Sequence, residues 1–319
     1  MATEFELIAK YFTRRSRTAF LGIGDDCALV KPPDGLALAI STDMLVEGVH
    51  FFADVDPRAL GHKVLAVNLS DLAAMGADPK WATLAMALPD ANEAWIAAFA
   101  EGFFALADRF DVELIGGDTT RGPRNLCVTI MGTFPPGNAM RRDGAQVGDE
   151  VWISGETGAA ALGVALKRGE IELDTMSRAA CLRRLEWPEP RIGLGRALRS
   201  FVSAAIDISD GLVADLGHIC ERSNVGMRID LERIPRAGPV RALSDRARAN
   251  QAVLSGGDDY ELAFTAPPAV QDAVKTAAVR AGVMVTCIGE VVATPQTVRL
   301  HDVNGVELTL PVKGFDHFG

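Results

Sequence analysis

The sequence has few of the features that mark export, zinc binding or nucleic-acid binding. Its five cysteines show no CxxC spacing, and their number is odd, so we expect neither a zinc site nor a disulfide framework. The first residues, MATEFELIAKYFTRRSR, lack the apolar core of a signal peptide, and no uninterrupted apolar stretch is as long as a membrane span. The net charge is −10, which argues against nucleic acid or an anionic membrane as a partner. We therefore expect a soluble, cytoplasmic protein.

A Walker-type phosphate loop is also missing. No GxxxxGK[ST] pattern occurs, and the glycine-rich stretch GETGAAALG, residues 155–163, lacks the lysine that such a loop needs. We interpret this stretch as the start of a helix. If the protein binds a nucleotide, it does so by other means.

The chain is long enough for two domains. It has 319 residues, of which 48% are apolar and 23% charged, as is typical of globular proteins. The Pro/Gly-rich stretch FPPGNAMRRDGAQVGD interrupts the pattern of elements. We predict an N-terminal α/β domain over residues 1–137, a linker over 138–149 and a C-terminal α/β domain over 150–319.

Strands and helices alternate along both predicted domains, which favours an α/β fold with mixed sheets. In the N-terminal domain we expect strands at 36–40, 81–88, 112–115 and 126–134, and helices at 62–75 and 92–110. In the C-terminal domain we expect strands at 150–154, 204–208, 227–231, 260–265 and 283–288. Helices are expected at 192–201, at 212–222 and after Pro268, with a closing hairpin that turns at Asn304-Gly305.

Acidic motifs recur along the chain, and most follow an apolar segment. They read GIGDDCA, STDMLVEG, NLSDLAAMG, LIGGDTTRG, AIDISDGL and LSGGDDYEL. Carboxylates crowded in this way repel one another unless a cation lies among them. The candidate ligands are six carboxylates and three hydroxyls: Asp26, Asp43, Asp71, Asp118, Asp207, Asp210, Ser41, Thr42 and Ser209. These hard oxygens favour magnesium, manganese or calcium, with a nucleotide phosphate as the companion.

A single Gly-Asp or Asp-Gly pair has a simpler explanation. Such pairs are more often turns or helix N-caps than ligands, because an Asx turn needs only local hydrogen bonds. Several acidic motifs after apolar segments are harder to explain as turns. The series as a whole favours a shared metal and phosphate site.

Seven segments, taken in order, resemble the thiamine-monophosphate kinase family. They are GIGDDCAL, AISTDMLVEGVHF, AVNLSDLAAMGADP, LIGGDTTRGP, IDISDGL, LSGGDDYEL and KGFDHF. The family is part of a wider group, related to aminoimidazole ribonucleotide synthetase, that uses ATP without a P-loop. The resemblance implies a two-domain fold of that group and a homodimer whose N-terminal sheets join into a barrel, with ATP sites near the subunit contact.

The resemblance also implies roles for individual residues. Several Mg²⁺ ions would be held by Asp26, Ser41, Thr42, Asp43, Asp71, Asp118, Asp207 and Asp210. ATP would contact Gly117, Asp118, Arg142 and Ser209, and thiamine monophosphate would contact His50, Asp258 and Phe315. The implied reaction is transfer of the γ-phosphate of ATP to thiamine monophosphate, which gives thiamine diphosphate.

The chemistry of this reaction needs metal ions more than a base. The second pKa of a phosphate monoester is about 6, so near neutral pH the acceptor is already an anionic nucleophile. Two highly charged phosphates must then approach each other, and their repulsion is the main obstacle. We therefore expect no catalytic general base. We expect Asp258 to suit either the cationic thiazolium ring or the aminopyrimidine donor of thiamine, and Phe315 to offer an aromatic face for stacking or a cation-π contact.

Two alternatives remain open. Within the wider group, the chain could be a synthetase acting on an amide or a selenide, or a hydrogenase-maturation protein, although the cysteines that the selenide enzyme and the maturation protein use are absent from the expected positions. From another class, the acidic loops could form a non-catalytic calcium or nucleotide-binding module. Calorimetric titration separates these, because a kinase of this kind binds ATP weakly without Mg²⁺.

Overall fold

The computed structural model describes residues 3–309 and Gly314. It divides into two compact units. The first contains the residues up to Leu72 and Ala77–Gly137, and the second contains Ala73–Gly76 and the residues from Asn138 onward. Residues 135–149 contain no helix or strand. None of the described helices is long and apolar enough to cross a membrane.

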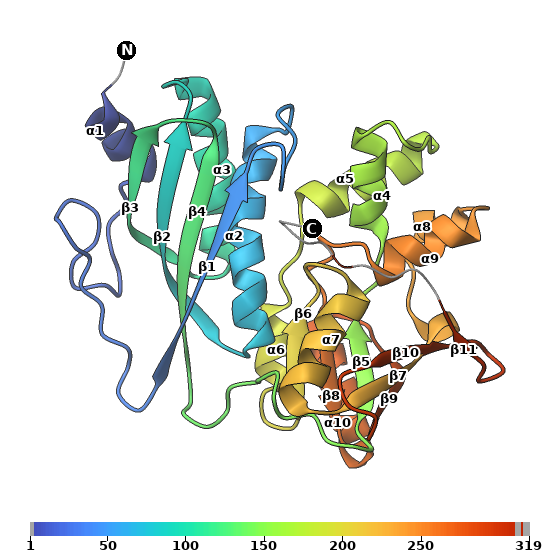
Figure 1. The fold of residues 1–319 in the computed structure, drawn as a ribbon. Coiled ribbons are helices and arrows are strands. Elements are labelled where there is room, and N and C mark those ends of the chain that lie inside the picture. Colours follow the sequence, from blue (N-terminus) through green and yellow to red (C-terminus); the bar gives the residue numbers. More distant parts are fainter. Residues whose placement is uncertain (1–2, 310–313, 315–319) are drawn as a thin grey trace. The chain divides into compact units, whose positions relative to one another are not determined.

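The first unit is a four-stranded mixed sheet with helices on one face (Figure 1). The strand order is β1-β4-β2-β3, and only the β2–β3 pair is parallel. The strands are β1 (Ala37–Val46), β2 (Asp78–Leu88), β3 (Glu113–Arg121) and β4 (Asn125–Phe134). The helices are α1 (Glu4–Leu7), the π-helix η1 (Ile8–Phe12), α2 (Pro57–Ala74) and α3 (Glu93–Arg109).

The core of this unit lies between the sheet and the helices α2 and α3. Apolar residues recur along α3 at helical spacing, so that one stripe of the helix is buried. Phe99 and Phe103 are fully buried, and Phe99 stacks on Trp95 with ring centroids 5.3 Å apart. Trp81 of β2 is 1% exposed, and its indole N–H donates to the hydroxyl of Thr18 at 2.9 Å. Asn92 caps α3 by accepting the Trp95 N–H.

The opposite face of this sheet has no helix over it in the described part of the chain (Figure 1). Side chains alternate along each strand, so every second residue points to this open sheet face. Ile40 and Met44 of β1 are 60% and 51% exposed there. Thr42 lies between them, and its hydroxyl is 2.8 Å from that of Thr129 on β4. The open sheet face is therefore partly apolar.

The second unit is built on a seven-stranded mixed sheet with the order β11-β10-β7-β9-β5-β8-β6. Only the β10–β7 pair is parallel. The strands are β5 (Glu150–Ser154), β6 (Ala204–Asp207), β7 (Gly226–Asp230), β8 (Leu262–Ala266), β9 (Val285–Val292), β10 (Val298–His301) and β11 (Glu307–Leu308). The mixed α/β class expected from the sequence is confirmed.

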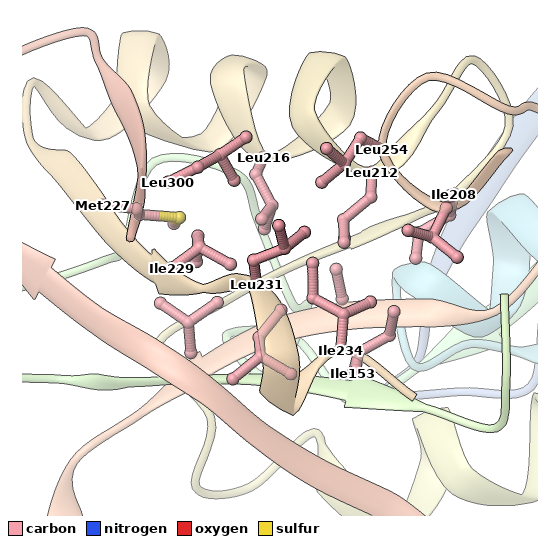
Figure 2. Packing of buried hydrophobic residues seen from close by; sticks show 14 of the residues in the cluster. Ile153, Ile208, Leu212, Leu216, Met227, Ile229, Leu231, Ile234, Leu254 and Leu300 are labelled. Carbon is pink, nitrogen blue, oxygen red and sulfur yellow. The ribbon is translucent and has the colours of Figure 1, made fainter. Parts of the chain in front are cut away.

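Seven α-helices accompany this sheet in the described residues. They are α4 (Ala159–Lys167), α5 (Thr175–Glu186), α6 (Ile192–Leu198), α7 (Leu212–Ser223), α8 (Gly238–Ala242), α9 (Arg246–Leu254) and α10 (Gln271–Ala281), with short 3-10 turns η2 (Leu231–Arg233) and η3 (Pro268–Val270). Figure 2 shows Leu212 and Leu216 of α7 facing Ile229 and Ile153 of the sheet. Trp152 of β5 is 2% exposed and stacks on Phe264 of β8.

Candidate active site

In the first unit, β1 and α2 bring together several side-chain oxygens. Ser41 and Asp43 are two residues apart on β1, so they point to the same, helix-covered face of the sheet. The Ser41 hydroxyl donates to Asp71 Oδ2 at 2.5 Å, and the Asp43 N–H donates to Asn68 Oδ1 at 3.1 Å. Asn68 and Asp71 are three residues apart and share one side of α2. The Ser41 hydroxyl and the Asp71 carboxylate thus meet here, with the Asn68 amide oxygen one helical turn away and the Asp43 side chain on the same face of the sheet.

Thr42 does not join these oxygens. It lies between Ser41 and Asp43 on a continuous strand, so its side chain points to the open sheet face, where it is exposed. The sequence suggested that the strand ends before Ser41. Instead, β1 runs on to Val46, because its alternating buried positions continue through Leu45.

Gly117 and Asp118 lie on β3, inside the strand and not after it. The β2–β3 register skips one residue at Ile115, which is a bulge, and Asp118 then pairs with Ala85. A side chain at Gly117 is impossible, since a Cβ there would lie 1.8 Å from the carbonyl oxygen of Leu84. Glycine therefore allows β3 to continue close to β2 at this point.

The sheet order keeps Asp118 away from Asp43 within one chain. β1 and β3 are the two edge strands, separated by β4 and β2. Neighbouring strands lie about 4.8 Å apart, so three spacings put roughly 14 Å between these edges. Ligands of one Mg²⁺ lie about 2.1 Å from the ion. Asp43 and Asp118 of the same chain therefore do not share one ion.

Asp26 lies in the irregular segment before β1. It is exposed, and its N–H is accepted by the side chain of Asp25 at 2.9 Å. A bridge between Leu21 and Leu29 closes this acidic loop. Asp26 thus takes part in local hydrogen bonding within this loop.

His50 is held by its backbone neighbours. Its Nδ1 accepts the Val46 N–H at 3.0 Å, and its carbonyl oxygen accepts Lys63 Nζ at 3.3 Å. Because an accepting Nδ1 carries no proton, the neutral ring carries its proton on Nε2. His50 is therefore set up as a hydrogen-bond donor through Nε2.

In the second unit, the loop after β6 carries three of the predicted residues. Asp207 ends β6 and is 5% exposed, and Ser209 and Asp210 follow it at half-buried positions. The side chain of Asp215, on the first turn of α7, accepts the N–H groups of Ser209, Asp210 and Gly211. Burial and the charge of Asp210 raise the pKa of the Asp215 carboxyl to about 7, against the effect of these three N–H groups.

Asp258 lies on a second loop that pairs with the first. The Asp258 N–H donates to the Ser209 carbonyl oxygen at 2.9 Å, and the Tyr260 N–H donates to that of Ile208 at 2.8 Å. Asp258 and Tyr260 both have positive φ, 63° and 49°, which residues other than glycine rarely adopt. The Tyr260 hydroxyl donates to Asp258 Oδ1 at 3.0 Å and so orients that carboxylate.

The last acid of LSGGDDYEL, Glu261, anchors this second loop. It is fully buried, and its carboxylate accepts Arg184 at 2.7 Å, Arg191 Nε at 2.6 Å and the Ser154 hydroxyl at 2.6 Å. Burial alone would raise the pKa of the Glu261 carboxyl, but the hydrogen bonds and charges of the two arginines outweigh it and lower that pKa. This buried ion cluster is structural.

Asp259 is the other buried acid of this motif. Both of its carboxylate oxygens accept the N–H of Gly158, just before α4, at 3.0 and 3.1 Å. Burial raises the pKa of the Asp259 carboxyl well above its usual value. The glycine-rich stretch 155–163 thus opens α4, as expected, and an acid of the chain itself occupies its start.

The structure says little about the roles of the two remaining predicted residues, Arg142 and Phe315. Arg142 is exposed, and its carbonyl oxygen accepts the Ser223 hydroxyl at 2.8 Å. Phe315 lies outside the described residues. Its neighbour Gly314 packs against Ala214 of α7, where an added Cβ would lie 2.5 Å from Ala214 Cβ.

The described residues contain no group of three or more His, Cys, Asp and Glu side chains arranged to hold a metal ion. The donors around Ser41 nevertheless fit Mg²⁺, because they are hard oxygens and because Mg²⁺ usually binds one or two carboxylates and takes its other ligands from phosphate and water.

Sequence reasoning missed Asp215, Tyr260, Glu261 and the two arginines that bind Glu261. An acid in the first turn of a helix that follows a Ser-Asp-Gly loop is the only sequence signal for Asp215. The arginines give none, because they lie about 70 residues from Glu261 in the chain.

Comparison with known proteins gives consistent similarities over nearly the whole chain. Residues 24–134 match the N-terminal domain, and residues 146–301 the C-terminal domain, of AIR synthase related protein. A thiamine-monophosphate kinase of Salmonella typhimurium is 46% identical over 319 residues, which cover 99% of this chain and 98% of that protein.

Two solved structures are similar as well. The thiamine-monophosphate kinase of Stenotrophomonas maltophilia is 47% identical, with a TM-score of 0.83 over 88% of this chain and 90% of that one. The structure of AaThiL complexed with AMPPCP and TMP is 30% identical, with a TM-score of 0.78 over 90% of this chain and 89% of that one.

Proposed function

The chain belongs to the AIR synthase related family and, within it, to the thiamine-monophosphate kinases, and from this we propose that it transfers the γ-phosphoryl group of ATP to thiamine monophosphate. The product is thiamine diphosphate. The observation that carries the proposal is the match of the fold to a kinase complexed with AMPPCP, an ATP analogue, and TMP. We place the reaction in the cytoplasm, where the five free cysteines stay reduced.

In the first unit, Ser41, Asp43, Asn68 and Asp71 supply the oxygens for Mg²⁺. Mg²⁺, when bound, neutralises the charge of the two phosphates that must approach each other. We keep Thr42, Asp26 and Asp118 as further ligands, although each lies apart from these residues within one chain. Gly117 lets the backbone of β3 approach the nucleotide beside Asp118.

In the second unit, the paired loops present Asp207, Ser209, Asp210 and Asp258 on a fixed backbone. Ser209 and Arg142 contact ATP, and Asp207 and Asp210 are metal ligands. Asp258 binds the thiamine part of the acceptor, with its carboxylate oriented by Tyr260. Residues 138–149 link the two domains.

No side chain needs to remove a proton from the acceptor. The acceptor phosphate is anionic near neutral pH and attacks as it is. His50 fits this scheme as a donor, since its Nδ1 already accepts a backbone N–H. It binds the acceptor and does not act as a base.

The test is ADP formation with three acceptors: thiamine monophosphate, thiamine and an aminoimidazole precursor, each with Mg²⁺ and mass detection of the product. We expect turnover with thiamine monophosphate and almost none with free thiamine, because an alcohol needs a proton removed as it attacks. Comparable rates with thiamine and its monophosphate contradict the acceptor assignment. ATP binding that is independent of Mg²⁺, without turnover, indicates a binding module.

We also propose that the active form is a homodimer in which the open sheet faces of two copies line a barrel. Exposed apolar residues such as Ile40 and Met44 would then be buried. If the seam joins β1 of one copy to β3 of the other, Asp43 lies near the partner subunit's Asp118. This arrangement explains how two ligands on opposite edges of one sheet can serve the same ion.

Co-expression of the Asp43→Asn and Asp118→Asn chains tests the seam. Each variant alone lacks one ligand at both sites, whereas a mixed dimer holds one intact site and one doubly altered site. Half of randomly paired dimers are mixed, so we expect about a quarter of the wild-type activity to return. No return of activity, with mixed dimers present by mass, contradicts a shared site.

A further inference from the structure

Three consecutive backbone N–H groups converge on one oxygen of Asp215. Oδ2 accepts the N–H of Ser209 at 3.1 Å, of Asp210 at 3.2 Å and of Gly211 at 3.2 Å. The Asp215 N–H donates in turn to the Gly211 carbonyl oxygen at 3.0 Å. The N–H groups before a helix otherwise lack partners, and hydrogen bonds to a carboxylate are the stronger kind. The side chain therefore closes a ring between the loop and α7.

The carbonyl side of the same loop is fixed by the second loop. The Ser209 oxygen accepts the Asp258 N–H at 2.9 Å, and the Ile208 oxygen accepts the Tyr260 N–H at 2.8 Å. Gly257 presses against this loop so closely that a Cβ there would lie 2.3 Å from the Ser209 oxygen. The peptide groups of residues 208–211 are thus held from both sides.

A purely structural role does not explain why an acid is buried at position 215. Asp215 is 2% exposed and lies beside another carboxylate, Asp210, so its burial costs free energy that an apolar residue would not cost. An apolar residue at this position of α7 could not accept the three N–H groups. Asp215 thus fixes the N–H side of Ser209 and Asp210, whereas the second loop fixes the carbonyl side.

We propose that Asp215 is a positioning residue for phosphoryl transfer, which holds the peptides of residues 209–211 so that Ser209 and Asp210 point at Mg²⁺–ATP. It touches neither ATP nor metal itself. This inference rests on the proposed function for the roles of Ser209 and Asp210. The geometry of the ring does not depend on that function.

Two variants at position 215 distinguish the loss of these hydrogen bonds from a general loss of folding. Asp215→Ala removes the acceptor, and Asp215→Asn keeps one acceptor oxygen of similar position. Asp272→Ala is the matched control, because Asp272 is also an acid in the first turn of a helix of the same unit, on α10, away from these loops. Amide hydrogen exchange of a peptide spanning residues 208–212 reports the ring directly. Calorimetric titration with Mg²⁺–ATP reports its consequence.

For Asp215→Ala we expect loss of amide protection in this peptide, about tenfold weaker Mg²⁺–ATP binding and a higher Mg²⁺ requirement for turnover. We expect Asp215→Asn to restore most of the protection and of the affinity, and Asp272→Ala to match wild type. The proposal is overturned if Asp215→Ala binds Mg²⁺–ATP as tightly as wild type, or if Asp215→Asn is no better than Asp215→Ala. Should the wild type not bind Mg²⁺–ATP, the proposed function fails, and the exchange data alone decide the positional role.

Discussion

The buried ion cluster around Glu261 makes the second unit sensitive to a change of one atom. Glu261→Gln keeps the size of the side chain but removes its charge and turns one acceptor oxygen into a donor. Either oxygen already faces two donors: Oε1 accepts Arg184 and Arg191, and Oε2 accepts Arg191 Nε and the Ser154 hydroxyl. Arg184 and Arg191, only 26% and 15% exposed, lose their counter-ion.

The expected cost follows from this burial. Removing one partner from a buried ion pair destabilises a protein by about 3 to 5 kcal/mol, because the other charge stays buried. For a unit of this size, that lowers the melting temperature by roughly 10 °C. Scanning calorimetry at pH 7 measures the shift for the transition of the second unit.

The control is Glu290→Gln on β9. Glu290 also pairs with an arginine, Arg228, at 3.0 Å, but both side chains are exposed. An exposed pair contributes less than about 1 kcal/mol. If Glu261→Gln melts within about 2 °C of Glu290→Gln, the cluster does not hold the loop as we infer.

The pH dependence gives a second check on the same residue. The pKa of Glu261 is lowered in the folded protein, so its contribution to stability is present above its ordinary value of 4.5 and is lost as the pH falls further. The difference in melting temperature between wild type and Glu261→Gln should therefore be full at pH 7 and narrow below pH 4.5. A constant difference across this range contradicts the assignment.

Three further outcomes are expected. Asp43→Asn and Asp118→Asn should each lower turnover at saturating Mg²⁺ by at least about a hundredfold without changing the melting temperature. Near-normal turnover in both variants would show that these aspartates have only a structural role. His50→Asn lacks a donor at the place of Nε2 and should raise the KM for thiamine monophosphate more than it lowers kcat. His50→Gln, which can place a donor there, should keep a low KM. A His50→Asn enzyme with normal KM and no turnover would indicate that His50 is a general base. Because the pKa of Asp259 is raised in the folded protein, its contribution to stability is full below pH 3.8 and is lost as the pH rises above that value. Asp259→Asn should therefore flatten the fall of the melting temperature with rising pH. An unchanged slope would show that Asp259 is not the group whose titration causes this fall.

Much of the fold could be predicted from local patterns. The stripe of aromatic residues on α3 and the Asn92 cap fixed that helix to within a residue, and Gly76 with its positive φ follows the end of α2. The strands 150–154 and 126–134 were also found, because their apolar runs are bounded by polar turns. These signals involve residues that are close together in the chain, so they can be recognised from the sequence alone.

Other elements were missed or misjudged for a physical reason. The helices α5 and α9 are rich in arginine and bury only a few residues each, so they show no clear apolar stripe. β1 and β3 run through polar and glycine residues that were expected to form loops. Edge strands tolerate such residues because one side of their backbone and one face remain open.

The sequence predicted the types of residue in the candidate site, but not which of them lie close together. Of the residues that the motifs predicted, Ser41 and Asp71 lie within hydrogen-bond distance of each other. The distance between Asp43 and Asp118 depends on the strand order, which no local pattern encodes. Likewise, the sequence placed two acids of GGDDYEL together, yet the loop presents Asp258 and buries Asp259.

Each unit buries one indole, and the two indoles are in different surroundings. Trp81 donates its N–H to Thr18, whereas Trp152 is stacked on Phe264 and its buried N–H has no hydrogen-bond partner among the described residues. An indole without a hydrogen bond in an apolar stack emits at shorter wavelength than a hydrogen-bonded one. The chain therefore carries a separate optical reporter in each unit. With the half-buried Trp95 and Trp187 replaced by phenylalanine, ligand binding to one unit becomes spectroscopically distinguishable from binding to the other.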